Sequence, residues 1–255
     1  MGLSDTVYRS ARRVALAIGF QPRSYPLRGT SDLIPEEEKN STPMHRAFYE
    51  NKGAVVNKWR HYPSIYDRHL SSFRNKKTRI LEIGVSGGGS LQLWREYFGQ
   101  DATIFGIDIN PACAAFDGAA GKVRIGSQAD PSFLRSVAGE MGGIDIVIDD
   151  GSHVASHQRA SFETLFPMVS DNGVYICEDT HTAYWRGEFE GGYRRPSNFI
   201  EYSKRIIDDI HADFHHKPIQ LEGANRSIFG IHFYNSVIVV EKLAQSPPMQ
   251  IAVPG

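Results

Sequence analysis

The sequence predicts an α/β protein whose main domain is a largely parallel β-sheet with helices on both faces. From Thr78 onward, short apolar runs alternate with amphipathic stretches, which is typical of parallel strands joined by crossover helices. Two of these runs end abruptly in acids, at 149–150 and 178–179, as expected where a ligand binds at the carboxyl ends of parallel strands. A chain of 255 residues is long enough for one well-buried domain with an accessory segment, but too short for two full domains.

The first part of the chain, residues 1–75, is expected to form a helical arm or cap. A helix is predicted over 4–18, followed by a linker rich in Pro and Glu and by a second helical pattern in "HYPSIYDRHLSSF". Such an arm can pack on the main domain or on a second copy of the chain. It therefore favours a homo-oligomer.

The main domain is expected over residues 76–243. Its five parallel strands are predicted in "RILEIGV", "ATIFGIDI", "KVRIG", "IDIVIDD" and "GVYICED". A polar, aromatic lid over 181–198 then leads into a helix, and "RSIFGIHFYNSVIVVEK" predicts a closing antiparallel hairpin. The last residues, 244–255, are rich in Pro and Gln and are expected to form a loosely held tail.

Composition narrows the classes of partner. Charged residues make up 22% of the chain and the formal net charge is -1, so no global field recruits nucleic acid or an anionic membrane. No apolar stretch approaches the ~20 residues of a membrane span. The two cysteines, Cys113 and Cys177, are too few for a disulfide framework. We expect a cytoplasmic protein that acts on a small molecule and binds neither nucleic acid nor membrane.

A glycine-rich turn, "LEIGVSGGGS", follows the first strand and lets the backbone approach a ligand closely. The dinucleotide pattern needs a glycine where the chain has Ser86, which argues against a nicotinamide cofactor. The next strand ends in Asp108, 24 residues after Gly84, where a carboxylate can accept both hydroxyls of an adenosine ribose. These signals favour an adenosine-containing ligand, and the alternative is a tight turn with a helix cap.

Four acids end the strands "IDIVIDD" and "GVYICED", namely Asp149, Asp150, Glu178 and Asp179. Crowded carboxylates repel one another and resist desolvation, so they require a cation, a cationic ligand or open water. Hard oxygen ligands suit Mg²⁺ or a similar divalent ion, and no cysteine or paired-histidine spacing indicates zinc. The alternative is a turn with a helix cap, but the repetition of acids at the second strand favours a metal.

A histidine follows each acidic pair. His153 lies three residues after Asp150, and an ordinary imidazole pKa near 6.5 suits a general base. His181, just after the second pair, is the rival base. His153 could alternatively serve only as a helix cap.

Several motifs together resemble a known family. "ExGxxxGGS" from Glu82, the ribose-binding acid, "GSQAD" from Gly126 and the terminal hairpin resemble class I S-adenosylmethionine-dependent methyltransferases. More narrowly, "IDDGSH", "EDTHTAYW" and "HFYNS" resemble the metal-dependent sugar O-methyltransferases of macrolide and other glycoside tailoring, of the mycinamicin type. The resemblance covers about residues 78–241. It implies a Rossmann-like, seven-stranded sheet in the order 3-2-1-4-5-7-6, with strand seven antiparallel.

The resemblance also implies the site residues. Glu82 and Gly84 would hold the methionine end of S-adenosylmethionine, and Asp108 the ribose. Ser127, Gln128 and Asp130 would frame the adenine, Asp149 would lie near the cofactor's amino end, and Ser86 and Ser90 complete the cofactor set. Asp150, Glu178 and Asp179 would bind Mg²⁺.

The chemistry that follows is methylation of a sugar hydroxyl in a glycoside or saccharide. Mg²⁺ would chelate two neighbouring sugar oxygens, and His153 would remove the proton as the oxygen attacks the sulfonium methyl. Tyr184 and Trp185 in the lid would stack on the sugar, and Tyr62 would help to cover the site. Which sugar and which hydroxyl are methylated is left open by the sequence.

Two other functions fit parts of this sequence less well. A catechol-type O-methyltransferase shares the sheet, but its metal set resembles Asp, Asp, Asn rather than Asp, Glu, Asp. A nicotinamide-dependent oxidoreductase needs the glycine that Ser86 replaces, and its short-chain form needs a Tyr-x-x-x-Lys motif that is not found in the chain.

Overall fold

The computed structural model describes residues 33–216, 227–244 and 246–253. The chain divides into two compact units, Met1–Lys39 and Asn40–Gly255. Within the first unit, the described residues form the short helix α2 (Glu36–Lys39). The helix expected over 4–18 lies outside the described residues.

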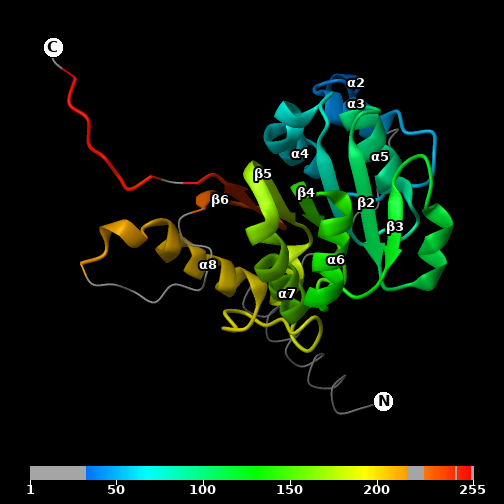
Figure 1. Ribbon diagram of the computed structural model, residues 1–255. Helices are drawn as coiled ribbons and strands as arrows, with labels where there is room; N and C mark the ends of the chain where they lie inside the picture. Colours follow the sequence, from blue (N-terminus) through cyan, green and yellow to red (C-terminus); the bar gives the residue numbers. More distant parts are fainter. Residues whose placement is uncertain (1–32, 217–226, 245, 254–255) are drawn as a thin grey trace, which may run out of the picture. The chain divides into compact units, whose positions relative to one another are not determined.

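The second unit is built on one seven-stranded sheet, in the order β3-β2-β1-β4-β5-β7-β6 (Figure 1). Strands β1 to β5 are parallel, and β7 runs antiparallel to β5 and β6. This order and the antiparallel seventh strand confirm the fold expected from the sequence. The strands are β1 (Arg79–Ile83), β2 (Thr103–Asp108), β3 (Lys122–Ile125), β4 (Ile144–Asp149), β5 (Val169–Cys177), β6 (Ile228–Tyr234) and β7 (Val237–Lys242).

Helices cover both faces of the sheet. One layer consists of α3 (Pro43–Tyr49), α4 (Tyr62–Leu70) and α5 (Gly89–Phe98), and the other of α6 (Pro131–Met141), α7 (Ala155–Leu165) and α8 (Phe199–Ile210). Short 3-10 turns are η2 (Ser71–Phe73), η3 (Pro111–Phe116), η4 (Phe166–Met168), η5 (Thr180–Tyr184) and η6 (Ala212–Phe214).

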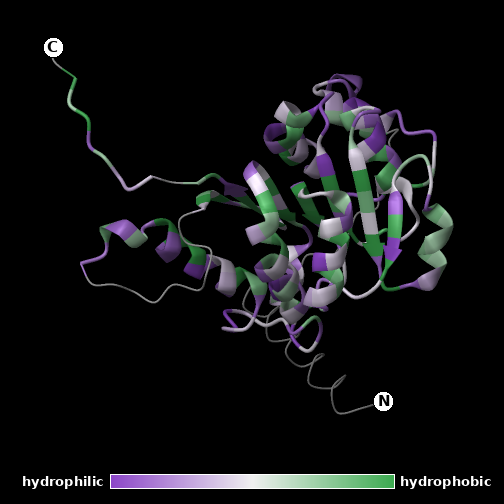
Figure 2. Ribbon diagram, viewed as in Figure 1, coloured by the Kyte–Doolittle hydropathy of each residue, from purple (hydrophilic) through white to green (hydrophobic). Residues whose placement is uncertain are grey.

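Side-chain alternation along the strands explains this sandwich. In β4, Ile146 and Ile148 pack toward the α3–α5 layer, whereas Val147 packs toward the α6–α8 layer. Both faces of the sheet are therefore apolar, and green, hydrophobic stretches recur along its strands (Figure 2). Among the described residues, no helix combines the length and the apolar character needed to cross a membrane.

The boundary between the units lies between Lys39 and Asn40, rather than at residue 75. The reason is that α3 and α4 contribute to the core of the sheet domain: Met44 and Tyr66 are fully buried in the same hydrophobic cluster as the sheet. Residues 40–75 are thus part of the domain that they were expected to cap.

The turn after β1 passes directly against the turn after β4. Gly84 has a φ of 97°, and a Cβ at this position would lie 2.1 Å from the backbone oxygen of Asp150. Only glycine fits this conformation and this close approach. The glycine-rich turn and the acidic strand end are therefore neighbours in space.

Candidate active site

The candidate site lies at the carboxyl ends of the parallel strands and has two sides. We call Glu82, the glycine-rich turn after β1, Asp108 and the loop after β3 the glycine-turn side. Asp150, Glu178 and Asp179, which follow β4 and β5, form the acidic cluster. Backbone bonds hold the two sides together, since Asp150 N donates to Ile83 O at 2.9 Å.

Glu82 is fully buried on β1, and α5 supplies its partners. Ser90 Oγ donates to Glu82 Oε2 at 2.8 Å, and Trp94 Nε1 donates to Oε1 at 3.0 Å. Burial raises the pKa of Glu82 to about 7, although the charge of Lys58 and the two hydrogen bonds lower it. A cationic group placed beside Glu82 would therefore find a carboxyl that ionises readily in its presence.

Asp108 ends β2 and faces the glycine-rich turn. Its Oδ2 accepts from Ser86 N at 2.9 Å and its Oδ1 from Asn110 N at 2.8 Å. Burial acts to raise the pKa of Asp108, but the backbone donors of Asn110 and Ser86 outweigh it and the pKa lies below the usual value. The carboxylate is thus held ionised, in the position expected for a ribose acceptor.

The Asp149 side chain is bonded to α7, to β5 and to the loop after β3. Its Oδ2 accepts from Ser161 Oγ at 2.6 Å and Tyr175 Oη at 2.8 Å, and its Oδ1 accepts from Gln128 Nε2 at 3.0 Å. Gly151 N adds a longer bond of 3.4 Å to Oδ1, so both oxygens of this buried carboxylate have partners within the protein. Asp149 is thus held firmly by its neighbours, and its expected place near the cofactor's amino end stays a prediction.

The residues expected to frame the adenine are hydrogen-bonded within the protein. Gln128 also accepts from Ser152 N at 2.6 Å, and Ser127 Oγ accepts from Ala129 N at 3.1 Å. Asp130 caps α6 by accepting from the backbone N–H groups of its first turn. These bonds fix the loop after β3, which lies next to the loop after β2 in the sheet.

A lysine compensates the charge of the acidic cluster. Lys58 Nζ lies 2.5 Å from Asp150 Oδ2 and 2.7 Å from Glu178 Oε2, and the side chains of Lys58 and Glu178 are only 3% and 1% exposed. Burial lowers the pKa of Lys58, but the charges of Asp150 and Glu178 outweigh it and raise the pKa above the ordinary value. The cluster therefore holds a cation.

Aromatic side chains of the same segment bind the other carboxylate oxygens. Trp59 Nε1 donates to Asp179 Oδ1 at 3.0 Å, and Tyr62 Oη donates to the same atom at 2.6 Å. Tyr66 Oη donates to Glu178 Oε1 at 2.6 Å. The Tyr62 side chain is buried, with 1% of the residue exposed, and its hydroxyl supports Asp179. Its expected part in covering the site stays a prediction.

His153 lies beside two of the acids. Its Nε2 is 3.8 Å from Asp150 Oδ1 and 3.8 Å from Asp179 Oδ2. One donor atom from each of the three residues lies within 4.8 Å of the others, a spacing that can hold a metal ion. Glu178 is not in this group, and its carboxylate is bound by Lys58 and Tyr66.

Backbone and side-chain strain mark the same place. His153 and Asp179 have φ values of 58° and 51°, a left-handed conformation that costs a non-glycine residue ~1 kcal/mol. His153 Nδ1 is buried and has no hydrogen-bond partner among the described residues. Unsatisfied buried polar atoms and strained backbone concentrate at functional sites.

His181, the rival base, is held from the other side of the cluster. Its Nδ1 lies 2.5 Å from Ser236 Oγ, in the β6–β7 turn, and 3.9 Å from Asp179 Oδ1. Burial lowers the pKa of His181, although the charge of Asp179 opposes this. Ser236 engages Nδ1 of His181, which leaves Nε2 as the ring nitrogen that can accept a proton.

The expected lid passes over His153. Trp185 and Tyr184 are 45% and 51% exposed, and the Trp185 ring contacts His181 with centroids 5.1 Å apart. Phe189 lies 6.3 Å from the His153 ring, centroid to centroid, and its carbonyl accepts from the backbone of α7 at 3.1 Å. The Phe189 ring thus lies beside His153, and the Trp185 ring lies beside His181.

Sequence reasoning missed two partners of the acids, Lys58 and Trp59, and also Ser236, which contacts Tyr62 and His181. The three acids did indicate that a cation was required, but a single lysine in "VVNKWRHY" has no pattern that assigns it to strands 92 and 120 residues further on. Only packing of the pre-β1 segment on the strand ends brings it there.

Comparison with known proteins gives a consistent result. Residues 81–180 match a family model described as a methyltransferase domain. Mycinamicin VI 2''-O-methyltransferase of Micromonospora griseorubida is 40% identical over 190 residues, which cover 69% of this chain and 47% of that protein. The 8-demethyl-8-(2-methoxy-alpha-L-rhamnosyl)-tetracenomycin-C 3'-O-methyltransferase of Streptomyces olivaceus is 39% identical over 195 residues, 72% of this chain and 50% of that protein. The chain thus spans about half the length of these curated relatives.

Solved structures similar to this chain are also methyltransferases. MycE methyltransferase from the mycinamycin biosynthetic pathway, in complex with Mg, SAH and mycinamycin VI, matches with a TM-score of 0.71 at 31% identity, over 88% of this chain and 66% of that chain. Another structure of it, with Mg and SAH, matches with a TM-score of 0.69 at 36% identity, over 82% of this chain and 55% of that chain. The region matched by the family model contains the glycine-rich turn and all three acids of the cluster.

Proposed function

The chain contains a class I, S-adenosylmethionine-dependent methyltransferase domain, and from that premise we propose that it methylates a sugar hydroxyl of a glycoside with the help of Mg²⁺. The observation that carries the proposal is the acidic cluster. Its carboxylates hold a cation directly beside the glycine-rich turn. The curated relatives named above are O-methyltransferases acting on glycosides, which supports this substrate class.

On the glycine-turn side, the proposed cofactor contacts begin with two acids. Glu82 is the proposed partner of the cofactor's amino group, because the burial that raises its pKa favours a cationic partner. Asp108 is the proposed ribose acceptor, because its carboxylate is held ionised at the end of β2. The turn between them, with Gly84 and Ser86, allows close approach of the methionine portion.

The acidic cluster fits a divalent ion of the Mg²⁺ type. Its donors are carboxylate oxygens, which Mg²⁺ prefers, and Lys58 demonstrates that they accommodate a positive charge. We propose Asp150, Glu178 and Asp179 as the ligands, with Lys58 withdrawing when the ion binds. When bound, Mg²⁺ would act as a Lewis acid that makes a sugar hydroxyl more acidic.

The protein's own groups handle the proton and the orientation. His153 Nε2, which faces Asp150 and Asp179, is the proposed general base that removes the hydroxyl proton. Trp59 and Tyr62 fix the orientation of Asp179. We propose that the lid, with Trp185, excludes water and packs on the sugar during transfer.

The test is methyl transfer from S-adenosylmethionine to a panel of glycosides and catechols, with and without EDTA and added Mg²⁺. We expect transfer to glycosides only, abolished by EDTA and restored by Mg²⁺. Activity that survives EDTA, or that is undiminished in Asp150→Ala, contradicts the metal role. Transfer to catechols alone would establish the catechol-type alternative, and full activity in His153→Ala would reassign the base to His181.

Two further expectations, on cellular location and on assembly, accompany this proposal. We propose that the protein works in the cytoplasm, and that it forms a homo-oligomer. Light scattering on the purified full chain measures the assembly, and a strictly monomeric mass contradicts the second expectation.

A further inference from the structure

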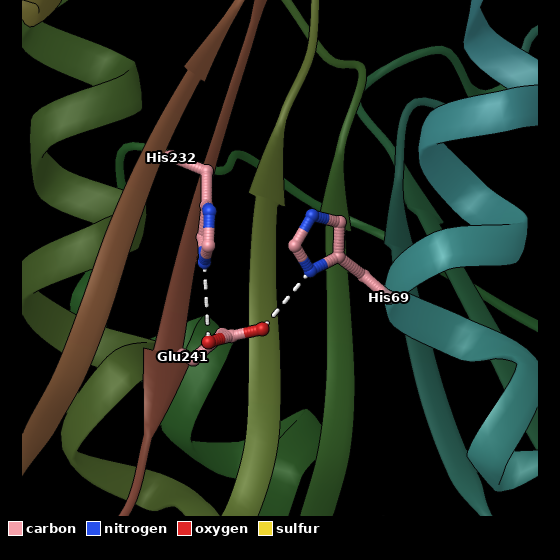
Figure 3. Close-up of side chains that lie close together, drawn as sticks. All are labelled: His69, His232 and Glu241. Atoms are coloured by element: carbon pink, nitrogen blue, oxygen red, sulfur yellow. Dashed lines mark hydrogen bonds and ion pairs between the residues drawn. The ribbon is translucent and has the colours of Figure 1, made fainter.

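A second group of metal-ligating side chains lies away from the acidic cluster, on the α4 face of the β6–β7 hairpin. It consists of His69 from α4, His232 from β6 and Glu241 from β7 (Figure 3). One nitrogen of each histidine and one oxygen of the glutamate lie within 4.8 Å of one another. No contact of this group involves the acidic cluster, and it plays no part in the proposed methyl transfer.

The glutamate lies between the two imidazole rings. His69 Nδ1 is 3.0 Å from Glu241 Oε1, and His232 Nε2 is 3.2 Å from Glu241 Oε2. Both histidines approach through a ring nitrogen and not through a carbon edge (Figure 3). At such distances the lone pairs of nitrogen and oxygen repel one another unless a proton or a metal ion lies between them.

A neighbouring tyrosine bears on which nitrogen of His69 is free. His69 Nε2 lies 2.9 Å from Tyr234 Oη. When Nε2–H donates to this hydroxyl, the lone pair of Nδ1 points at Glu241, and a cation is required there. An oxygen partner on the second ring nitrogen is the usual arrangement for a histidine that binds a metal.

His232 supplies the second argument. Its Nε2 is buried and has no well-aligned hydrogen bond among the described residues, despite its closeness to the glutamate. The side chain as a whole remains 40% exposed, whereas that of His69 is 3% exposed. The group therefore has a ring nitrogen, His232 Nε2, that lacks a hydrogen bond within the described residues and could bind a metal. The exposed part of the His232 side chain gives solvent access to the group.

We propose that His69, His232 and Glu241 bind a divalent transition-metal ion of the Zn²⁺ class. Two imidazoles and one carboxylate with a position left for water are a set that Zn²⁺ favours. The oxygen-only acidic cluster instead suits Mg²⁺. The two sites are thus distinguished by ligand chemistry, and this proposal stands whether or not the chain methylates a sugar.

The consequence of binding is structural. Tyr62, Tyr66 and His69 lie along one face of α4, and the first two donate to the acidic cluster. The hairpin carries Ser236, which contacts Tyr62 and His181. An ion joining His69 to the hairpin would therefore tie together two elements that support the acidic cluster.

The experiment uses the full chain, stripped of metal with a chelator and held in excess Mg²⁺ so that Mg²⁺ competes for the acidic cluster. Titration with Zn²⁺ is followed by calorimetry, and titration with Co²⁺ by visible absorption. We expect one equivalent of each to bind, the cobalt bands to be those of a four- or five-coordinate nitrogen and oxygen site, and the melting temperature to rise with Zn²⁺ concentration. Absence of binding by the unaltered chain overturns the proposal.

Variants locate the ion. His232→Asn and Glu241→Gln should each weaken Zn²⁺ binding by ~10-fold or more, whereas His211→Asn, a histidine outside both groups, should bind as the unaltered chain does. Asp150→Asn should also retain Zn²⁺ binding, and its loss there would place the ion in the acidic cluster and overturn the proposal. Unchanged affinity in His232→Asn does the same.

A measurement on the unaltered chain guards against variants that fail to fold. In ¹⁵N-histidine spectra, Zn²⁺ should shift the ring nitrogens of two histidines at one equivalent, with Mg²⁺ present throughout. If folded variants can be made, the shifted signals should be those missing in His69→Gln and His232→Asn. Shifts confined to other histidines contradict the site.

Discussion

The two sides of the candidate site satisfy their acids in different ways. On the glycine-turn side, Glu82 and Asp108 receive hydrogen bonds from neutral groups within 22 residues, the α5 side chains and the turn backbone. In the acidic cluster, Asp150 and Glu178 share the ammonium of Lys58, from 92 and 120 residues away. One side is completed by its own local fold, and the other by a distant segment.

This difference indicates which side of the site can exchange one bound cation for another. Neutral hydrogen bonds to Glu82 and Asp108 leave their charge for a ligand and need not be broken when it binds. The ammonium of Lys58 is itself a cation, so the proposed divalent ion would compete with it for the same oxygens. We infer that the glycine-turn side is preorganised and that the acidic cluster exchanges one cation for another.

The largest effect is expected from Asp150→Asn, which removes a charged oxygen donor from the acidic cluster only. Methyl transfer should fall by ~10³-fold or more, because the ion that stabilises the developing alkoxide is lost. S-adenosylmethionine affinity, measured by calorimetry, should stay within a factor of ~3 of the unaltered value, well below the ~1.4 kcal/mol of a tenfold change. Glu163→Gln on the exposed side of α7 is the matched control. Equal losses of turnover and cofactor affinity would show that the two sides are not separable.

Replacement of the lysine tests the exchange itself. Lys58→Met leaves the buried Glu178 and the partly exposed Asp150 without their cation, so without Mg²⁺ the free energy of unfolding should fall by ~3 kcal/mol. Mg²⁺ should restore more stability to Lys58→Met than it adds to the unaltered chain, because it no longer competes with an ammonium. Denaturant unfolding with and without Mg²⁺ measures both. The same Mg²⁺ increment in both proteins argues against competition at this site.

The same contrast explains how far the sequence predicts the molecule. Alternating apolar runs predict the parallel strands, and acids at 149–150 and 178–179 predict where the site lies, because strand direction brings carboxyl ends to one edge. The strand order and most residue roles came from family resemblance. Lys58 could not be assigned, since no local pattern links it to β4 and β5. The inward turn of Asp149 was equally hidden, because it depends on partners supplied by α7 and β5.

The glycine-turn side should respond to a smaller perturbation. Asp108→Asn keeps the size of the side chain but removes the charge that the backbone donors stabilise. We expect S-adenosylmethionine to bind ~10-fold more weakly, a loss of ~1.4 kcal/mol, with no change in the Mg²⁺ concentration needed for half-maximal activity. Calorimetry and a Mg²⁺ titration of activity measure the two quantities. A shifted Mg²⁺ requirement would mean that the charge of Asp108 acts across both sides.

The smallest effect is expected at the opposite end of β4, where an acid has a permanent partner. Asp145 accepts from Arg79 N, Nε and Nη2 at 2.7 to 3.0 Å, and from Ser170 Oγ at 2.5 Å. Burial acts to raise the pKa of Asp145, but the bonds from Arg79 and Ser170 outweigh it and the pKa lies below the usual value.

An acid with a lowered pKa in the folded state stabilises the protein above its ordinary pKa, near 3.9, and loses that contribution as the pH falls through the lower folded value. Asp145→Asn should therefore cost ~1 kcal/mol of unfolding free energy at pH 7, and the difference from the unaltered chain should shrink below about pH 4.

Mg²⁺ should not restore the stability lost in Asp145→Asn, because Arg79 remains in place and no acid is left for an ion to bridge. Denaturant unfolding at several pH values, with and without Mg²⁺, measures this. A difference that stays constant down to pH 3 would assign the loss to shape rather than charge, and a Mg²⁺ rescue would show that exchange of cations is not confined to the carboxyl ends of the strands.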